Sequence, residues 1–232
     1  MQLILIRHPE SQANVKRLVY GHTDWDYSPK GEQSVEVVAN FVHRAWFSQG
    51  AQHTDLDGQS KGKVRLYSSP LKRAATLAHR IAEKLQLPVD LDQDIIEMNV
   101  GIFENLTEEE LLDRHREEWE SYMQDYENYL IPEGESWTMV HERVGRFLNR
   151  IREQAKSDQR DGDSVAIVVC HAMVIRGLLM HLLHLNLSGT WEFDIQPASI
   201  TALRWEEGFA QLTSLIQVEQ MMEQYPNFAT DL

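Results

Sequence analysis

Residues 3–11 read LILIRHPES, so a run of four apolar residues is followed at once by Arg7 and His8. An unbroken apolar run of this length is typical of a strand that is buried on both faces of a sheet. The pattern returns most clearly at residues 165–169, VAIVV, and a further short strand is predicted at residues 64–67. These stretches predict the central strands of a mostly parallel sheet.

Segments with helical spacing of apolar residues separate these strands. Helices are predicted over residues 31–47, 70–85, 136–156 and 171–185, a short strand over 88–91, and an antiparallel hairpin over 200–205 and 210–215. Strands that alternate with helices predict an α/β fold with three layers, α/β/α, in which the sheet is mostly parallel and has one antiparallel edge. Ser69 is expected to cap the helix that follows it, with Pro70 in the first turn.

The chain of 232 residues is long enough for one large domain. We expect a single domain over residues 1–216 and a poorly ordered polar tail over residues 217–232. A helical cap is expected to be inserted at about residues 98–135, where Thr107 begins a capping-box pattern. The polar residues 48–63 predict a solvated loop.

Composition narrows the classes of function and location. The formal net charge of −14 argues against general binding to nucleic acid or to an anionic membrane. Cys170 is the only cysteine, which excludes an intrachain disulfide and a cysteine-cluster metal site. The first residues lack the basic and apolar regions of a secretory signal, and no run approaches the length of about 18 apolar residues of a membrane span. We therefore expect a cytoplasmic protein.

Basic and imidazole side chains follow the predicted strands. Arg7 and His8 follow the first strand, Arg73 lies in the first turn of the helix after the second, and His171 begins the helix after the run at 165–169. Ligands of open α/β sheets bind beyond the carboxyl ends of the strands. Helix N-termini at that edge also favour anions. The sequence therefore predicts a local anion site in an acidic protein.

Six blocks of the chain resemble the histidine phosphatase superfamily, which also contains the cofactor-dependent phosphoglycerate mutases. They are residues 5–11 (LIRHPES), 21–33 (GHTDWDYSPKGEQ), 69–76 (SPLKRAAT), 97–104 (EMNVGIFE), 132–136 (PEGES) and 168–171 (VVCH). The ordered set spans about residues 3–177 and is far more specific than any one block. Pro9 stands where the family usually has glycine, and we expect it to start the following helix, where its missing N–H costs little.

The resemblance implies a role for each matching polar residue. His8 would be the nucleophile that forms a phosphohistidine, and Glu97 the general acid and then the general base. The residues implied to bind phosphate or substrate are Arg7, Asn14, Thr23, Arg73, His171 and Ala172, of which Arg7, Arg73 and His171 also act in catalysis. Burial is expected to raise the pKa of Glu97, because a general acid must be protonated part of the time near neutral pH. No metal ion and no cofactor is implied.

The function expected from this resemblance is hydrolysis of a small phosphorylated metabolite, in the manner of a histidine acid phosphatase. The alternatives are a cofactor-dependent phosphoglycerate mutase and a non-catalytic member that binds a partner. Residues 104–110 are acidic, which disfavours a phosphoglycerate or bisphosphate ligand and so favours the phosphatase.

Other features of the blocks leave alternatives open. Asp24, Glu104 and Glu135 lie in the blocks and are interpreted as structural residues. Four aromatic residues of the cap, Trp119, Tyr122, Tyr126 and Tyr129, either line a pocket or form core. A homodimer paired at the edge hairpin also remains open.

Overall fold

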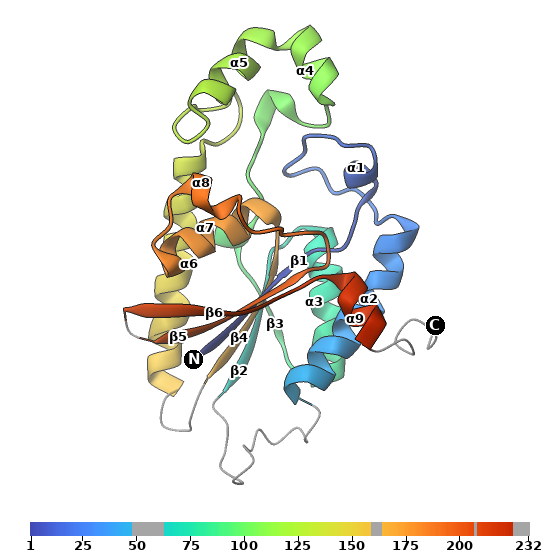
Figure 1. Ribbon diagram of the computed structural model, residues 1–232, viewed down its shortest axis with the longest axis vertical. Helices are drawn as coiled ribbons and strands as arrows, with labels where there is room; N and C mark the ends of the chain where they lie inside the picture. Colours follow the sequence, from blue (N-terminus) through green and yellow to red (C-terminus); the bar gives the residue numbers. More distant parts are fainter. Residues whose placement is uncertain (48–62, 159–163, 207, 225–232) are drawn as a thin grey trace.

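The computed structural model describes residues 1–47, 63–158, 164–206 and 208–224. A six-stranded sheet in the order β3-β2-β4-β1-β5-β6 runs through its centre (Figure 1). Its strands are β1 (Gln2–Arg7), β2 (Val64–Ser68), β3 (Val89–Leu91), β4 (Val165–Cys170), β5 (Ile200–Glu206) and β6 (Phe209–Ile216). The first four pair in parallel, whereas β5 and β6 form an antiparallel edge. The predicted α/β fold is confirmed.

Helices cover both faces of the sheet, and the alternation of side chains along β1 shows why. Leu3 and Leu5 are fully buried against the face covered by α6 (Trp137–Asp158) and α7 (Ala172–Leu183). Ile4 and Ile6 are fully buried against the opposite face, which is covered by α2 (Pro29–Val42), α3 (Lys72–Leu85) and α9 (Val218–Gln224). Figure 1 shows the two sets of helices on opposite sides of the strands. Residues 3–6 of β1 are apolar at every position because both faces of this strand are core.

Short helical turns connect the main elements. They are α1 (Gln12–Val15), a π-helical turn at His43–Phe47, 3-10 turns at Gln93–Ile95 and Gly101–Phe103, and α8 (Leu187–Thr190). The glycine at 101 is required by the backbone, because its φ is +48° and an added Cβ would lie 2.0 Å from the carbonyl oxygen of Pro132. This close approach joins the start of the cap to its end.

The cap consists of two short helices, α4 (Glu108–Arg114) and α5 (Arg116–Gln124), which project beyond one end of the body (Figure 1). Thr107 forms the predicted capping box with Glu110 at the start of α4. The four aromatic residues of the cap are partly buried against the core: Trp119 and Tyr122 pack edge-on against Phe103, and Tyr126 and Tyr129 pack against the same cluster. This cluster attaches the cap to the α6–α7 side of the sheet.

Two local predictions are wrong. Ser69 does not cap α3, because the N-cap is Leu71 and the Ser69 hydroxyl lies 2.7 Å from His171 Nε2 instead. Pro9 does not start a helix, because Ser11 is the N-cap of α1 and the helix begins at Gln12. In both cases the residue contacts a histidine at the end of a strand, since the Pro9 carbonyl lies 2.7 Å from His8 Nδ1.

The expectation of a poorly ordered tail is also wrong over residues 218–224. There α9 packs on α2, with Val218 and Met221 buried. Residues 225–232 and nearly all of the predicted loop at 48–63 lie outside the described residues. No described helix combines the length and the apolar character that a bilayer crossing requires.

Candidate active site

Two histidines face each other beyond the carboxyl ends of β1 and β4. His8 follows β1 and His171 is the N-cap of α7, and their ring centroids lie 5.2 Å apart. Only 2% of His8 and none of His171 is exposed. The two residues come together because β1 and β4 are parallel neighbours in which Arg7 pairs with Cys170. The next residue of each strand therefore reaches the same place.

The contacts of the His8 imidazole indicate which ring nitrogen carries the proton. Its Nδ1 lies 2.7 Å from the carbonyl oxygen of Pro9, which can only accept a hydrogen bond, so Nδ1 donates. Burial, followed by the charges of Arg73 and Arg7, holds the pKa of His8 well below its ordinary value. The remaining nitrogen, Nε2, thus carries a lone pair and is available as a nucleophile.

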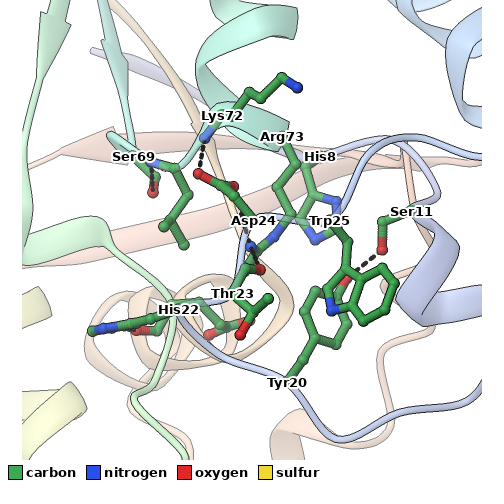
Figure 2. A network of polar contacts seen from close by, with 12 residues as sticks. His8, Ser11, Tyr20, His22, Thr23, Asp24, Trp25, Ser69, Lys72 and Arg73 are labelled. Carbon is green, nitrogen blue, oxygen red and sulfur yellow. Dashed lines mark hydrogen bonds and ion pairs between the residues drawn. The ribbon is translucent and has the colours of Figure 1, made fainter. Parts of the chain in front are cut away.

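Arg73 is a fully buried guanidinium that is held mainly by backbone carbonyls. It donates to the carbonyl oxygens of Thr23 at 2.9 Å and Gly21 at 2.6 Å, and its guanidinium lies 4.8 Å from the centroid of the Tyr20 ring. Asp24 is 3.6 Å from Arg73 Nη1, and Figure 2 shows these side chains grouped beside His8. Arg73 Nε has no partner among the described residues. Because a guanidinium has five N–H donors, several remain for a bound anion.

Arg7 is anchored in a similar way, by a backbone carbonyl. Its Nη1 donates to the carbonyl oxygen of Ile195 at 2.7 Å, and its buried Nε has no partner in the described parts of the chain. Burial lowers the pKa of Arg7, although the guanidinium stays charged at neutral pH. Two buried guanidiniums close to one another are costly without an anion between them.

Neutral donors complete the lining predicted from sequence. Asn14 Oδ1 accepts hydrogen bonds from Ser11 N, Ser11 Oγ and Tyr20 Oη at 2.9–3.1 Å, which leaves the Asn14 amino group for another acceptor. Thr23 Oγ1 accepts a hydrogen bond from Asn105 at 2.9 Å and keeps its own proton to donate. Ala172 is the first residue of α7, where backbone N–H groups have no acceptor within the helix.

Glu97 is a buried carboxyl group at the start of the cap, and only 8% of the residue is exposed. Its Oε1 accepts a hydrogen bond from Met98 N at 2.9 Å, and its Oε2 lies 3.5 Å from Met173 N in the first turn of α7. Burial raises the pKa of Glu97, while the hydrogen bond from Met98 and the charges of Arg73, Arg143 and Arg7 oppose that rise. The direction is the one expected for a general acid.

The other acidic residues of the blocks bind backbone amides or arginine. Glu104 accepts hydrogen bonds from Gly21 N and Thr23 N at 2.9–3.0 Å, and Asp24 accepts one from Lys72 N at 2.9 Å (Figure 2). These contacts hold the segment around residues 21–24 against α3. Their negative charge is therefore used in supporting Arg73 rather than facing an incoming anion.

Sequence reasoning missed a clamp on the backbone of Glu97. Arg143, on α6, donates from Nη2 to the Glu97 carbonyl oxygen at 3.1 Å and from Nη1 to that of Asp94 at 2.9 Å. Arg143 also forms a largely buried ion pair with Glu135, 3.0 Å between Nε and Oε1. The PEGES block pointed to Glu135, but no spacing rule pairs it with a residue eight positions later.

Tyr20 and Ser69 are further site residues that sequence reasoning did not assign to the site. The Tyr20 hydroxyl contacts Ser11 at 2.9 Å (Figure 2) and Asn14 at 3.1 Å, and the Ser69 hydroxyl contacts His171. Tyr20 adjoins a recognised block at Gly21, which is the only signal it carries. Ser69 lies in the block at residues 69–76, but its place before a helix favours a helix cap.

The arrangement can bind a tetrahedral oxyanion between the guanidiniums of Arg7 and Arg73 and the imidazole of His171. His8, whose pKa is lowered, and Glu97, whose pKa is raised, both lie within electrostatic reach of Arg73 and Arg7. Among the described residues, no group of three or more His, Cys, Asp and Glu side chains is arranged to hold a metal ion. The rings of His8 and His171 thus lie together, and the charges of Arg7 and Arg73 act on both rings and on Glu97, while the roles of these residues stay predictions.

Comparisons with known proteins agree with this geometry. A family model described as "Histidine phosphatase superfamily (branch 1)" matches residues 3–217. Phosphoserine phosphatase 1 of Hydrogenobacter thermophilus is 30% identical over 207 residues, which cover 89% of this chain and 88% of that protein. Adenosylcobalamin/alpha-ribazole phosphatase of Escherichia coli is 27% identical over 215 residues, 93% of this chain and 95% of that protein.

A solved structure shows the same likeness in three dimensions. The alpha-ribazole phosphatase of Shigella flexneri superposes with a TM-score of 0.75 at 26% identity, over 94% of this chain and 97% of that one. The match thus extends over nearly the whole length of both chains.

Proposed function

The chain belongs to the histidine phosphatase superfamily, branch 1, and from that premise we propose that it hydrolyses a small phosphomonoester through a phosphohistidine on His8. The observation that carries the proposal is the state of His8. Its proton is directed to the Pro9 carbonyl at 2.7 Å, and its other nitrogen is left unprotonated in a ring on which the charges of Arg73 and Arg7 act. Phosphatases among the relatives support hydrolysis as the type of reaction.

In the first step, the lone pair of His8 Nε2 attacks phosphorus and the bond from phosphorus to the ester oxygen breaks. Protonated Glu97 gives its proton to that oxygen, so the leaving group departs as an alcohol. Arg7, Arg73 and His171 stabilise the negative charge on the equatorial phosphoryl oxygens. The products of this step are a phosphohistidine, a free alcohol and an ionised Glu97.

In the second step, water attacks the phosphohistidine. The Glu97 carboxylate accepts a proton from the water as the bond from phosphorus to Nε2 breaks. Inorganic phosphate leaves, His8 returns to its neutral form, and Glu97 is again protonated. One residue therefore acts as acid and then as base, which its intermediate environment of burial and nearby arginines supports.

The position of Tyr122 supports a role for the cap in selecting the leaving group of the substrate. Tyr122 is a partly buried residue whose pKa is raised by burial, then by Tyr126 and by the charge of Glu97. Its phenol is thus within electrostatic reach of the group that protonates the leaving oxygen. No hydrogen bond to the Tyr122 hydroxyl is found among the described residues, which leaves it available to a substrate.

The test is release of inorganic phosphate from a panel of monoesters that includes O-phosphoserine and α-ribazole phosphate, after the names of the relatives. We expect wild type to hydrolyse at least one ester and His8→Ala to lose all measurable activity. His79→Ala, an exposed position on α3, is the matched control and should retain activity. Equal activity of His8→Ala and wild type would remove His8 from the mechanism.

A second measurement separates hydrolysis from the alternatives. Wild type that is mixed with a labelled ester and quenched in alkali should carry an acid-labile label, and His8→Ala should carry none. A label that passes to a sugar acid rather than to water would indicate a mutase. Absence of both label and phosphate release across the panel would favour a binding protein.

A further inference from the structure

Ser69 and His171 form a buried polar pair whose members come from different parts of the chain. Ser69 follows β2 and His171 follows β4, and neither residue is exposed at all. The Ser69 hydroxyl lies 2.7 Å from His171 Nε2. The pairing of β2 with β4 sets this contact, since Ser69 N also donates to the Val169 carbonyl at 3.0 Å.

The direction of this hydrogen bond follows from the other contacts of Ser69. Among the described residues, its Oγ has two hydrogen-bond partners: His171 Nε2 and the backbone N–H of Leu71, at 3.3 Å. The Leu71 N–H can only donate, so the one acceptor available to the serine proton is His171 Nε2. If Nε2 carried a proton instead, the buried serine O–H would have no acceptor, which is costly.

The opposite nitrogen of His171 then carries the ring proton. His171 Nδ1 is buried and has no partner in the described parts of the chain. The ring centroid of His171 lies 5.2 Å from that of His8 and its Nε2 contacts Ser69, so Nδ1 is the nitrogen left to meet an anion beside His8. An N–H group there would donate to an anion, whereas a bare lone pair would repel it.

We propose that Ser69 is a positioning residue: its hydroxyl donates to His171 Nε2, keeps the ring proton on Nδ1, and so presents an N–H donor to a phosphoryl oxygen. The last part rests on the proposed function, because it requires a phosphoryl group in the site. The position of the proton does not require one, so the two parts are tested separately.

The position of the proton is measured by long-range ¹H–¹⁵N correlation NMR on protein labelled with ¹⁵N-histidine, without ligand, at pH 8. His171→Gln identifies the signals of His171. We expect wild type to show a protonated Nδ1 and an unprotonated Nε2 at His171. In Ser69→Ala this preference should be lost, and Ser69→Thr, which keeps a hydroxyl group, should restore it.

Ser68→Ala is the matched control. Ser68 is also fully buried, but its hydroxyl donates to the Ser69 carbonyl at 2.8 Å rather than to a histidine. Its variant should show the wild-type tautomer of His171. The proposal is overturned if wild type carries the proton on Nε2, or if Ser69→Ala keeps the wild-type pattern.

Kinetics test the second part. Deleting a hydrogen-bond donor to the transition state typically lowers kcat by about 10²–10³-fold. Ser69→Ala keeps the imidazole of His171 and changes only which nitrogen carries the proton. We therefore expect a smaller fall in kcat, of about tenfold to 10²-fold. KM should change less, and Ser69→Thr should recover most of kcat. An equal loss in Ser68→Ala would reduce Ser69 to a packing role. No hydrolysis by wild type together with the expected tautomer would refute the proposed function alone.

Discussion

At the scale of single residues, burial acts in opposite directions on the proposed nucleophile, His8, and the proposed general acid, Glu97. It lowers the pKa of His8 and raises the pKa of Glu97, and so favours the uncharged form of both groups. An uncharged imidazole can attack phosphorus, and an uncharged carboxyl group can protonate a leaving oxygen. The same low-dielectric pocket therefore prepares a base and an acid at one pH.

Glu97→Gln tests this state. Because the folded pKa of Glu97 lies above the unfolded value, its contribution to stability is present at low pH and is lost as pH rises through the folded pKa. Glutamine does not ionise, so the stability of the variant relative to wild type should rise between pH 5 and pH 8. Its kcat should fall by about 10²–10⁴-fold, since it neither gives nor takes a proton.

Urea denaturation at the two pH values and phosphate release at pH 7 measure these effects. Glu223→Gln, an exposed position near the end of α9, is the control and should show neither effect. A Glu97→Gln variant whose relative stability did not change with pH would show that the carboxyl group is not perturbed as described.

At the scale of elements, helix α6 supports the site from outside the pocket. Through Arg143 it binds the carbonyl oxygens of Asp94 and Glu97, and through the ion pair with Glu135 it binds the end of the cap. Glu135 also accepts a hydrogen bond from Asn99 N at 2.8 Å. One arginine thus connects both ends of the cap insertion to the helix beside the sheet.

Arg143→Met should therefore be strongly destabilising. It would leave the largely buried Glu135 carboxylate without its cation, and removal of one partner of a buried pair costs about 3–5 kcal/mol. The double variant Arg143→Met with Glu135→Met should recover part of that loss. Thermal and urea unfolding of the single and double variants measure the coupling.

Arg146→Met provides the comparison one turn along α6. Arg146 is 60% exposed in its ion pair with Asp94 at 2.9 Å, so its loss should cost less than about 1 kcal/mol. Equal losses for Arg143→Met and Arg146→Met would mean that the buried clamp contributes no more than a surface pair.

At the scale of the whole molecule, the site must attract an anion into a protein with a formal net charge of −14. The attraction is local, from two guanidiniums and helix α7, whereas the repulsion comes from the whole surface. Raising the ionic strength from about 0.01 M to about 0.1 M shortens the Debye length from about 30 Å to about 10 Å. The distant repulsion is screened first.

We therefore expect kcat/KM for a dianionic ester to rise over this range of sodium chloride, by about tenfold or less. kcat at saturating substrate should stay constant, because a substrate that is already bound is no longer repelled by the acidic surface during its approach. Initial rates at low and at saturating substrate separate the two constants. A steady fall of kcat/KM with salt would show that the local attraction already dominates the approach.

The local sequence was enough to predict the layers of the fold and the residues that stand at the strand ends. Unbroken apolar runs such as residues 3–6 and 165–169 identify strands that are buried on both faces, because that environment is encoded position by position. Arg7, His8 and His171 are neighbours of those runs. Their meeting follows from parallel pairing of the strands.

Only the tertiary structure decided which partner each polar group takes. Ser69 has the sequence context of a helix cap but contacts His171, which is 102 positions away. Arg143 pairs with Glu135 and with the backbone of Glu97. Helix α9 forms because α2 covers its apolar face. Such choices depend on which groups are close in space once the chain is compact. A buried polar group takes the partner that satisfies it best, and distance along the chain says little about which one that will be.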